Sequence, residues 1–233
     1  LGRIAGRERH PSCPQLLYVM NFRLPIVTLS IAASAFIAQF TPVLAGALEF
    51  NRAAIAQREG WRFVTAHLTH FDLNHLIWDL AVFVLLGTIC EQSSRRRLAA
   101  GLILASVTIT AAIWWWQPQF TSYRGLSGLD CALFGIFTGG LLQRRDPIAN
   151  LVGALGLLGV VAKCGAELST GVTLFAAGTT YAPVPLSHLV GAAGGLISSR
   201  WFVTSERPPA PRTRAPLTFP RQKSCSPNPR PCP

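Results

Sequence analysis

Ser127 is the side chain in this sequence best placed to act as a nucleophile. It lies in the segment Gly125-Leu126-Ser127-Gly128, and the small glycines let another helix approach its hydroxyl closely. A serine hydroxyl becomes nucleophilic when an imidazole within hydrogen-bond reach takes its proton. Such a pair can transfer an acyl group through an oxyanion intermediate, which a helix N-terminus would stabilise.

His188 is the candidate base, and His75 with Asp79 is a candidate supporting pair. Gly191 and Gly195 follow His188, and their GxxxG spacing gives a helix a smooth face for close packing. We expect this face to pack against the helix of the serine, which would bring the imidazole beside the hydroxyl. His75 and Asp79 are four residues apart and therefore share one face of a helix.

Long apolar runs separated by short charged segments carry these residues. Half of the 233 residues are hydrophobic and 13% are charged, about half the charged share of a soluble globular chain. Each run is near the roughly 20 residues that a helix needs to cross a bilayer. The sequence therefore predicts an all-α membrane protein with six transmembrane helices, in the runs 24–48, 73–90, 98–123, 125–143 and 147–166 and in a last helix that starts near Leu186.

Basic residues lie mainly on one side of these predicted helices. Of the 21 lysines and arginines, four belong to the ends and loops of the other side: Arg52, Arg58, Arg62 and Arg124. This bias places both termini in the cytoplasm by the positive-inside rule. The net charge of +11 is then explained by topology, and a nucleic-acid partner is not expected because no basic patch stands apart from the apolar runs.

This orientation also predicts the depth of the candidate side chains. The second, fourth and sixth helices run inward from the outer surface, and His75, Ser127 and His188 each fall near the start of one of them. At a rise of about 1.5 Å per residue, the three lie at similar depth, a little below the outer surface. Asp130, three residues after Ser127, either serves as a further partner for a histidine or is a polar group that lines a water pocket or bonds a neighbouring helix.

The sequence predicts no metal ion and no cofactor. His67, His70 and Asp72 cluster ahead of the second helix, but no HExxH or comparable ligand set accompanies them. The six cysteines include no CxxC pair, so neither a zinc site nor a disulfide framework is indicated. Lys163 and Glu167 have i,i+4 spacing and are expected to form an ion pair.

These motifs, in this order, resemble the rhomboid family of intramembrane serine proteases over roughly residues 24–203. The family's GxSG motif appears at Ser127, its histidine with spaced glycines appears at His188, and a helix histidine matches His75. The WR element of the loop after the first helix appears as Trp61-Arg62. The resemblance implies a six-helix rhomboid-like bundle that cleaves membrane-anchored proteins within the lipid bilayer.

The resemblance also implies roles for the site residues. Ser127 and His188 would form the catalytic dyad, and His75 would help to form the oxyanion hole, supported by Asp79, Gly125 and Gly128. Many rhomboids carry an asparagine where Asp79 stands. An asparagine can donate a hydrogen bond to an oxyanion, whereas an ionised aspartate can only accept one. We therefore expect Asp79 to orient or charge His75, or else to be protonated.

Further details resemble the rhombosortase branch of the family. They are the segment Trp-Arg-Phe-Val-Thr-Ala-His-Leu over residues 61–68, the Tyr-x-Gly-Leu-Ser-Gly motif that begins at Tyr123, and a lysine before a glutamate near the end of the fifth helix. This branch implies processing of exported proteins with C-terminal GlyGly-type sorting tails at the bacterial cytoplasmic (inner) membrane. The alternative is a non-catalytic rhomboid-like protein that binds membrane helices.

The predicted organisation has three parts. Residues 1–23 form a cytoplasmic N-terminal segment, in which the only methionine, Met20, suggests that residues 1–19 precede the true start. Residues 24–203 form the six-helix domain. Residues 204–233 are rich in proline and arginine and should form a disordered cytoplasmic tail, because they cannot bury an apolar face.

Overall fold

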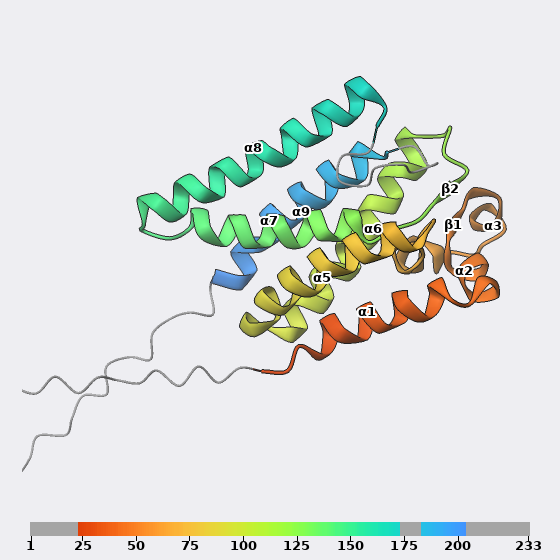
Figure 1. Cartoon of the computed structure of the whole chain (residues 1–233), viewed down its shortest axis with the longest axis horizontal. Coiled ribbons are helices and arrows are strands. Elements are labelled where there is room, and N and C mark those ends of the chain that lie inside the picture. Colours follow the sequence, from red (N-terminus) through yellow and green to blue (C-terminus); the bar gives the residue numbers. More distant parts are fainter. Residues whose placement is uncertain (1–22, 173–182, 204–233) are drawn as a thin grey trace, which may run out of the picture.

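The computed structural model describes residues 23–172 and 183–203. The predicted N-terminal segment with Met20, the predicted C-terminal tail and most of the loop ahead of the last helix lie outside these residues. Within them the framework consists of long helices packed side by side (Figure 1). These are α1 (Ile26–Gln39), α5 (Leu73–Ser93), α6 (Arg95–Trp116), α7 (Ser127–Leu142), α8 (Pro147–Thr170) and α9 (Pro185–Val203).

Short elements fill the connection between α1 and α5. They are α2 (Pro42–Leu48), β1 (Phe50–Asn51), α3 (Arg52–Ala56), α4 (Arg62–Thr65) and the 3-10 turn η1 (Ala66–Leu68). Strand β1 pairs antiparallel with β2 (Ser122–Tyr123), which directly precedes α7. The pairing joins this connection to the chain that leads into Ser127.

The first apolar run is not one helix over residues 24–48, as the sequence predicts. The chain bends by 117° between α1 and α2, and Pro42 is the first residue of α2. Proline has no N–H to donate and disfavours a helical conformation in the residue before it, so the helix cannot continue through Thr41. The predicted third helix also ends early, at Trp116, and residues 117–123 form a turn and β2 instead.

The other predicted spans lie within a few residues of observed helices. Helix α8 continues past the predicted end to Thr170, where Gly171 adopts a left-handed conformation with φ of 69°. Glycine tolerates this conformation and commonly ends helices. Helix α9 begins at Pro185, close to the predicted Leu186, because proline is well suited to the first turn of a helix.

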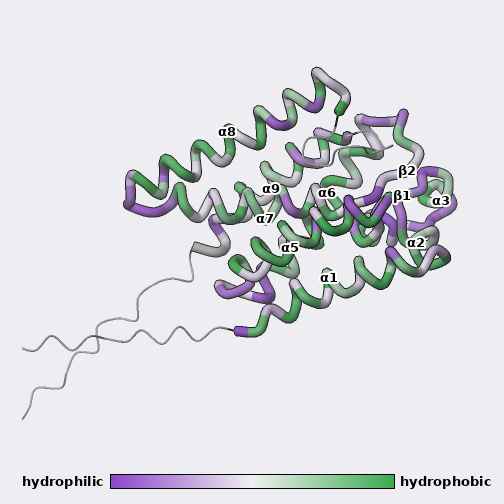
Figure 2. Tube along the Cα trace, viewed as in Figure 1, coloured by the Kyte–Doolittle hydropathy of each residue, from purple (hydrophilic) through white to green (hydrophobic). Residues whose placement is uncertain are grey.

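The helices have the length and apolar surface of a multi-pass membrane protein. Within the described residues α5, α6 and α8 are long and apolar enough to cross a membrane, and the bent pair of α1 and α2 raises this number to four. Figure 2 shows hydrophobic residues along the helices and hydrophilic residues in the turns between them. Helix α8 has a particularly open surface, which exposes large apolar side chains such as Leu151, Leu155 and Leu158.

Helix α7 lies at the centre of the bundle and packs most extensively against α9. It also contacts α5, α6 and α8. Its buried side chains include Leu129 and Leu133, which join Leu76 and Phe83 of α5 and Ile109 of α6 in the core. A central position explains how a helix of 16 residues can present its first residue to groups from several neighbours.

An arginine fixes the connection between α1 and α5 against the end of α6. The Arg52 guanidinium donates to the backbone carbonyl oxygens of Trp114 at 2.9 Å, Gln117 at 3.1 Å and Ile113 at 3.2 Å. These carbonyls belong to the C-terminal turn of α6, where acceptors lack intrahelical partners and a positive charge is favourable. Arg52 thus holds β1, and through it β2, next to the start of α7.

Candidate active site

Ser127 and His188 meet between α7 and α9. Ser127 is the first residue of α7 and His188 is the fourth residue of α9. The His188 Nε2 atom lies 3.1 Å from the Ser127 Oγ atom, and His188 is 5% exposed. A neutral imidazole that carries its proton on Nδ1 can accept the hydroxyl proton at Nε2. The pair therefore has the geometry of a nucleophile and its general base.

Two glycines of α9 allow this contact. A Cβ atom added at Gly191 would lie 2.1 Å from the carbonyl oxygen of Gly128, and one added at Gly195 would lie 1.9 Å from that of Ala132. Both distances are far below any real contact, so the two backbones touch where only glycine fits. The structure thus brings α9 against α7 through the glycines that the sequence singles out, and His188 lies one turn before Gly191.

The other ring nitrogen of His188 faces two charged groups of α8. The His188 Nδ1 atom is 3.3 Å from the Glu167 Oε2 atom and 3.3 Å from the Lys163 Nζ atom. Lys163 Nζ is also 2.6 Å from Glu167 Oε1, which confirms the predicted ion pair. The contact of this ion pair with His188 was not predicted from the sequence. The available signal was Lys163, an ionisable residue inside the predicted span 147–166, which needs polar partners. In the structure Glu167 is 1% exposed.

Asp79 lies between two histidines on the α5 side of Ser127. Its Oδ2 atom is 3.3 Å from His75 Nε2 and 3.2 Å from His70 Nε2. Gly125, with φ of 124°, passes so close that an added Cβ would lie 2.9 Å from His75 Nε2. A residue with a side chain would displace His75 and would rarely adopt this φ. His75 and Asp79 therefore lie against the backbone two residues before Ser127.

His67 and His70 hold the chain that leads into Ser127. His67 Nδ1 lies 3.3 Å from the carbonyl oxygen of Gly125, and its Nε2 lies 3.2 Å from the Thr110 hydroxyl. The backbone N–H of Leu126 donates to His70 Nε2 at 3.3 Å. Burial lowers the pKa of His67 to about 4 and also lowers the pKa of His70. The sequence suggests for these histidines only a metal site, which the missing ligand set argues against. Their role here could not be predicted, because their bonding partners come from distant segments.

Asp130 is buried on α7, with 7% of its surface exposed. Within the described residues its Oδ1 atom has no hydrogen-bond partner and its carboxylate makes no bond to a histidine. The structure thus gives Asp130 no histidine partner among the described residues, and it is a buried polar group on α7.

One group of side chains could hold a metal ion by geometry. Ligand atoms of Cys164, Glu167 and His188 lie within 4.8 Å of one another. The Lys163 ammonium, however, is 2.6 Å from Glu167 and 3.3 Å from His188. A cation already occupies the position where these ligands converge, so the donor set does not fit a metal site.

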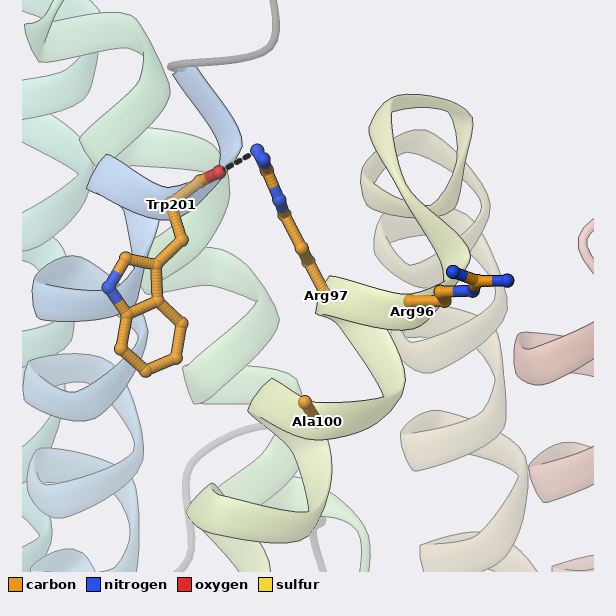
Figure 3. Close-up of a pocket in the computed structure, with 4 residues that line it drawn as sticks. All are labelled: Arg96, Arg97, Ala100 and Trp201. Atoms are coloured by element: carbon orange, nitrogen blue, oxygen red, sulfur yellow. Dashed lines mark hydrogen bonds between the residues drawn. The ribbon is translucent and has the colours of Figure 1, made fainter.

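A surface pocket of about 370 Å³ lies away from these residues, lined by Arg96, Arg97, Ala100 and Trp201. Figure 3 shows the Arg97 guanidinium bonded to the carbonyl oxygen of Trp201, with the indole on the other wall. Trp201 is 13 residues after His188, about 20 Å along α9 at 1.5 Å per residue. The pocket is therefore separate from the candidate active site.

Residues 57–205 match the family model described as the Rhomboid domain. The matched range covers more than half of the chain and contains every residue placed at the site above: the dyad candidates, the histidines and aspartate on the α5 side, and the ion pair of α8.

Proposed function

Because the chain belongs to the rhomboid family of intramembrane serine proteases, we propose that it is an endopeptidase that uses Ser127 and His188 as a catalytic dyad. The observation that carries this proposal is the 3.1 Å contact between Ser127 Oγ and His188 Nε2. It occurs at the N-terminus of a central helix, where the glycines of α9 let the two helices pack backbone against backbone.

The reaction follows from this geometry. His188 Nε2 takes the hydroxyl proton as Ser127 Oγ attacks the carbonyl carbon of the peptide bond, and His188 then gives that proton to the leaving amine. The C–N bond breaks and an ester to Ser127 remains. Water then gives a proton to His188 and attacks the ester, and the proton returns to Ser127 Oγ as the second product leaves.

The oxyanion needs hydrogen-bond donors on the side of the site that faces α5. Backbone N–H groups in the first turn of α7 have no intrahelical acceptor, and the helix dipole favours negative charge there. His75 lies against Gly125 and can donate from its ring. Asp79 is 3.3 Å from His75 Nε2, which supports a role in orienting or charging this imidazole rather than in contacting the oxyanion.

The proposed setting is the bacterial cytoplasmic membrane, with six spanning helices and both termini in the cytoplasm. The arginines at the start of α6 and in the turn between α7 and α8 support this orientation. Substrates would be exported proteins anchored by a membrane segment and cut near the outer leaflet. The resemblance of residues 61–68 and of the motif at Tyr123 to rhombosortases supports C-terminal GlyGly-type sorting tails as the recognised segment.

The test compares the wild-type protein with Ser127→Ala and His188→Ala. Both variants should insert into the membrane and lose cleavage of co-expressed exported proteins that carry C-terminal glycine-rich membrane tails. A fluorophosphonate should label the wild-type protein and leave Ser127→Ala unlabelled. Cleavage by purified Ser127→Ala would refute the dyad, and absence of both labelling and cleavage in the wild type would favour the non-catalytic binder of membrane helices.

A further inference from the structure

The Nδ1 atom of His188, which does not contact Ser127, lies beside Glu167 and Lys163 of α8. We propose that Glu167 is a positioning residue that fixes the tautomer and orientation of His188, and that Lys163 holds the carboxylate in place for this task. The inference rests on the proposed function, because it concerns how the same histidine becomes a base. It makes the active site a serine–histidine–glutamate arrangement that spans α7, α9 and α8.

The two oxygens of Glu167 lie beside two different partners. Oε2 is 3.3 Å from His188 Nδ1, and Oε1 is 2.6 Å from Lys163 Nζ. The side chain of Glu167 is fully buried and that of His188 is 7% exposed, so bulk water does not compete for either atom. A carboxylate that bridges an ammonium and an imidazole is held at both ends.

The position of one proton on His188 decides whether the residue can act as a base. Lys163 and Glu167 both approach Nδ1, one as a donor and the other as an acceptor. If Lys163 donated to Nδ1, the ring proton would be on Nε2, which would then point toward Ser127 and could not accept its proton. If Nδ1–H donates to Glu167, Nε2 keeps its lone pair for the Ser127 hydroxyl.

The ion pair favours the second arrangement. Lys163 Nζ is 2.6 Å from Glu167 Oε1 and 3.3 Å from His188 Nδ1, so its stronger interaction is with the carboxylate. A hydrogen bond is roughly twice as strong when one partner is ionised, so an Nδ1–H that donates to the Glu167 carboxylate also forms a strong bond. The pair also removes the penalty of an isolated charge within an apolar helix. Glu167 therefore stays ionised and accepts from Nδ1–H, as the carboxylate of a catalytic triad does.

A merely structural role predicts different behaviour from a positioning role. If Glu167 only neutralised Lys163, its replacement by the neutral, isosteric glutamine would disturb α8 packing and leave His188 active. In the positioning role Glu167→Gln has a specific defect. Lys163 attracts the amide oxygen to itself, which turns the NH₂ group toward Nδ1, and this donor stabilises the tautomer with its proton on Nε2.

The experiment measures kcat and KM on a cleaved membrane substrate, together with the rate at which a fluorophosphonate labels Ser127. We expect Glu167→Gln to lower kcat by at least about 100-fold and to slow labelling in parallel, with KM changed by less than about threefold; loss of the correct tautomer in a serine protease lowers kcat by up to about 10⁴. The labelling rate reports on the nucleophile without any contribution from substrate docking.

A second variant separates the tautomer from the folding of α8. In Lys163→Met/Glu167→Gln no cation attracts the amide oxygen, so the amide can turn its oxygen toward Nδ1–H. We expect this double variant to label at least about tenfold faster than Glu167→Gln alone, which a loss of structure cannot produce. Glu167→Asp, which keeps the charge on a shorter side chain, should also label faster than Glu167→Gln.

The outcomes distinguish this inference from the proposed function. Wild-type kcat and labelling in Glu167→Gln, together with an inactive Ser127→Ala, would overturn the positioning role and leave the protease standing. A double variant no faster than Glu167→Gln would likewise overturn the tautomer mechanism. If the wild-type protein neither cleaves nor labels, the proposed function itself has failed, and the behaviour of Glu167 is not the cause.

Discussion

Gly195→Ala should separate α9 from α7 and so impair the active site from a distance. Gly195 lies seven residues after His188, on the same face of the helix. A Cβ there would be 1.9 Å from the carbonyl oxygen of Ala132, whereas real Cβ atoms essentially never come within 3.0 Å of another atom. The obstacle is backbone rather than a flexible side chain, so the helices themselves have to move.

The expected magnitude follows from these distances. The two helices must separate locally by about 1 Å, and a displacement of that size can lower a catalytic rate by about 100-fold. The bond most exposed to the change is the 3.1 Å contact between His188 Nε2 and Ser127 Oγ, because it spans the same interface two turns away. We therefore expect kcat to fall by about 100-fold.

A neighbouring glycine provides the control. A Cβ added at Gly194 would meet nothing within 4 Å, so Gly194→Ala adds the same methyl group to the same helix without touching α7. It should keep the wild-type kcat. Both variants are compared by substrate cleavage, by fluorophosphonate labelling of Ser127 and by thermal unfolding in detergent, so that labelling is expressed per folded molecule. Wild-type labelling of folded Gly195→Ala would refute the claim that the close approach positions the dyad.

Two further predictions concern the α5 side of the site. Asp79→Asn should lower the rate of Ser127 labelling by roughly 100-fold, the lower end of the range for loss of an oxyanion donor, because an amide cannot charge His75. Unchanged or faster labelling would instead favour direct bonding of residue 79 to the oxyanion. His67, which lies outside the candidate spans, has its pKa lowered from 6.5 to about 4 by burial. The unfolded chain therefore binds a proton that the folded protein does not between pH 6.5 and about 4. Stability contributed by neutral His67 is complete above pH 6.5 and falls as the pH drops through this window, by on the order of 3 kcal/mol. His67→Gln should show a shallower decline in melting temperature over that window, and an identical decline would contradict the role of burial.

The sequence predicts most of the helices because apolar runs in a membrane protein must form internally bonded helices. It places the start of α7 near Ser127 and the start of α9 next to Pro185, where glycine and proline mark the boundaries. It fails over residues 24–48, because the absence of charge conceals a bend of 117° at Pro42. Hydropathy alone does not distinguish a spanning helix from an apolar segment that turns along the surface of the bundle.

The site is predictable where its members carry their own local signal. Ser127 with its glycines and His188 with GxxxG spacing can be found from the chain alone. Glu167 is the opposite case. Its i,i+4 spacing to Lys163 already accounts for it as half of an ion pair, so the sequence gives no reason to expect a further partner. Only the packing of α8 beside α9 reveals the contact with His188. His70 is similar, because its Nε2 atom accepts from a backbone N–H on another element and lies 3.2 Å from the carboxylate of an aspartate nine residues away.

The length of α7 has a consequence for where substrates would be cut. Its 16 residues span about 24 Å at 1.5 Å per residue, less than the roughly 30 Å thickness of the hydrocarbon core. Under the proposed topology Ser127 then lies several ångströms inside the outer boundary of that core. The position of the scissile bond would be counted in residues from the membrane boundary, so lengthening the apolar stretch of a substrate at its outer end should shift the cleavage site by the same number of residues.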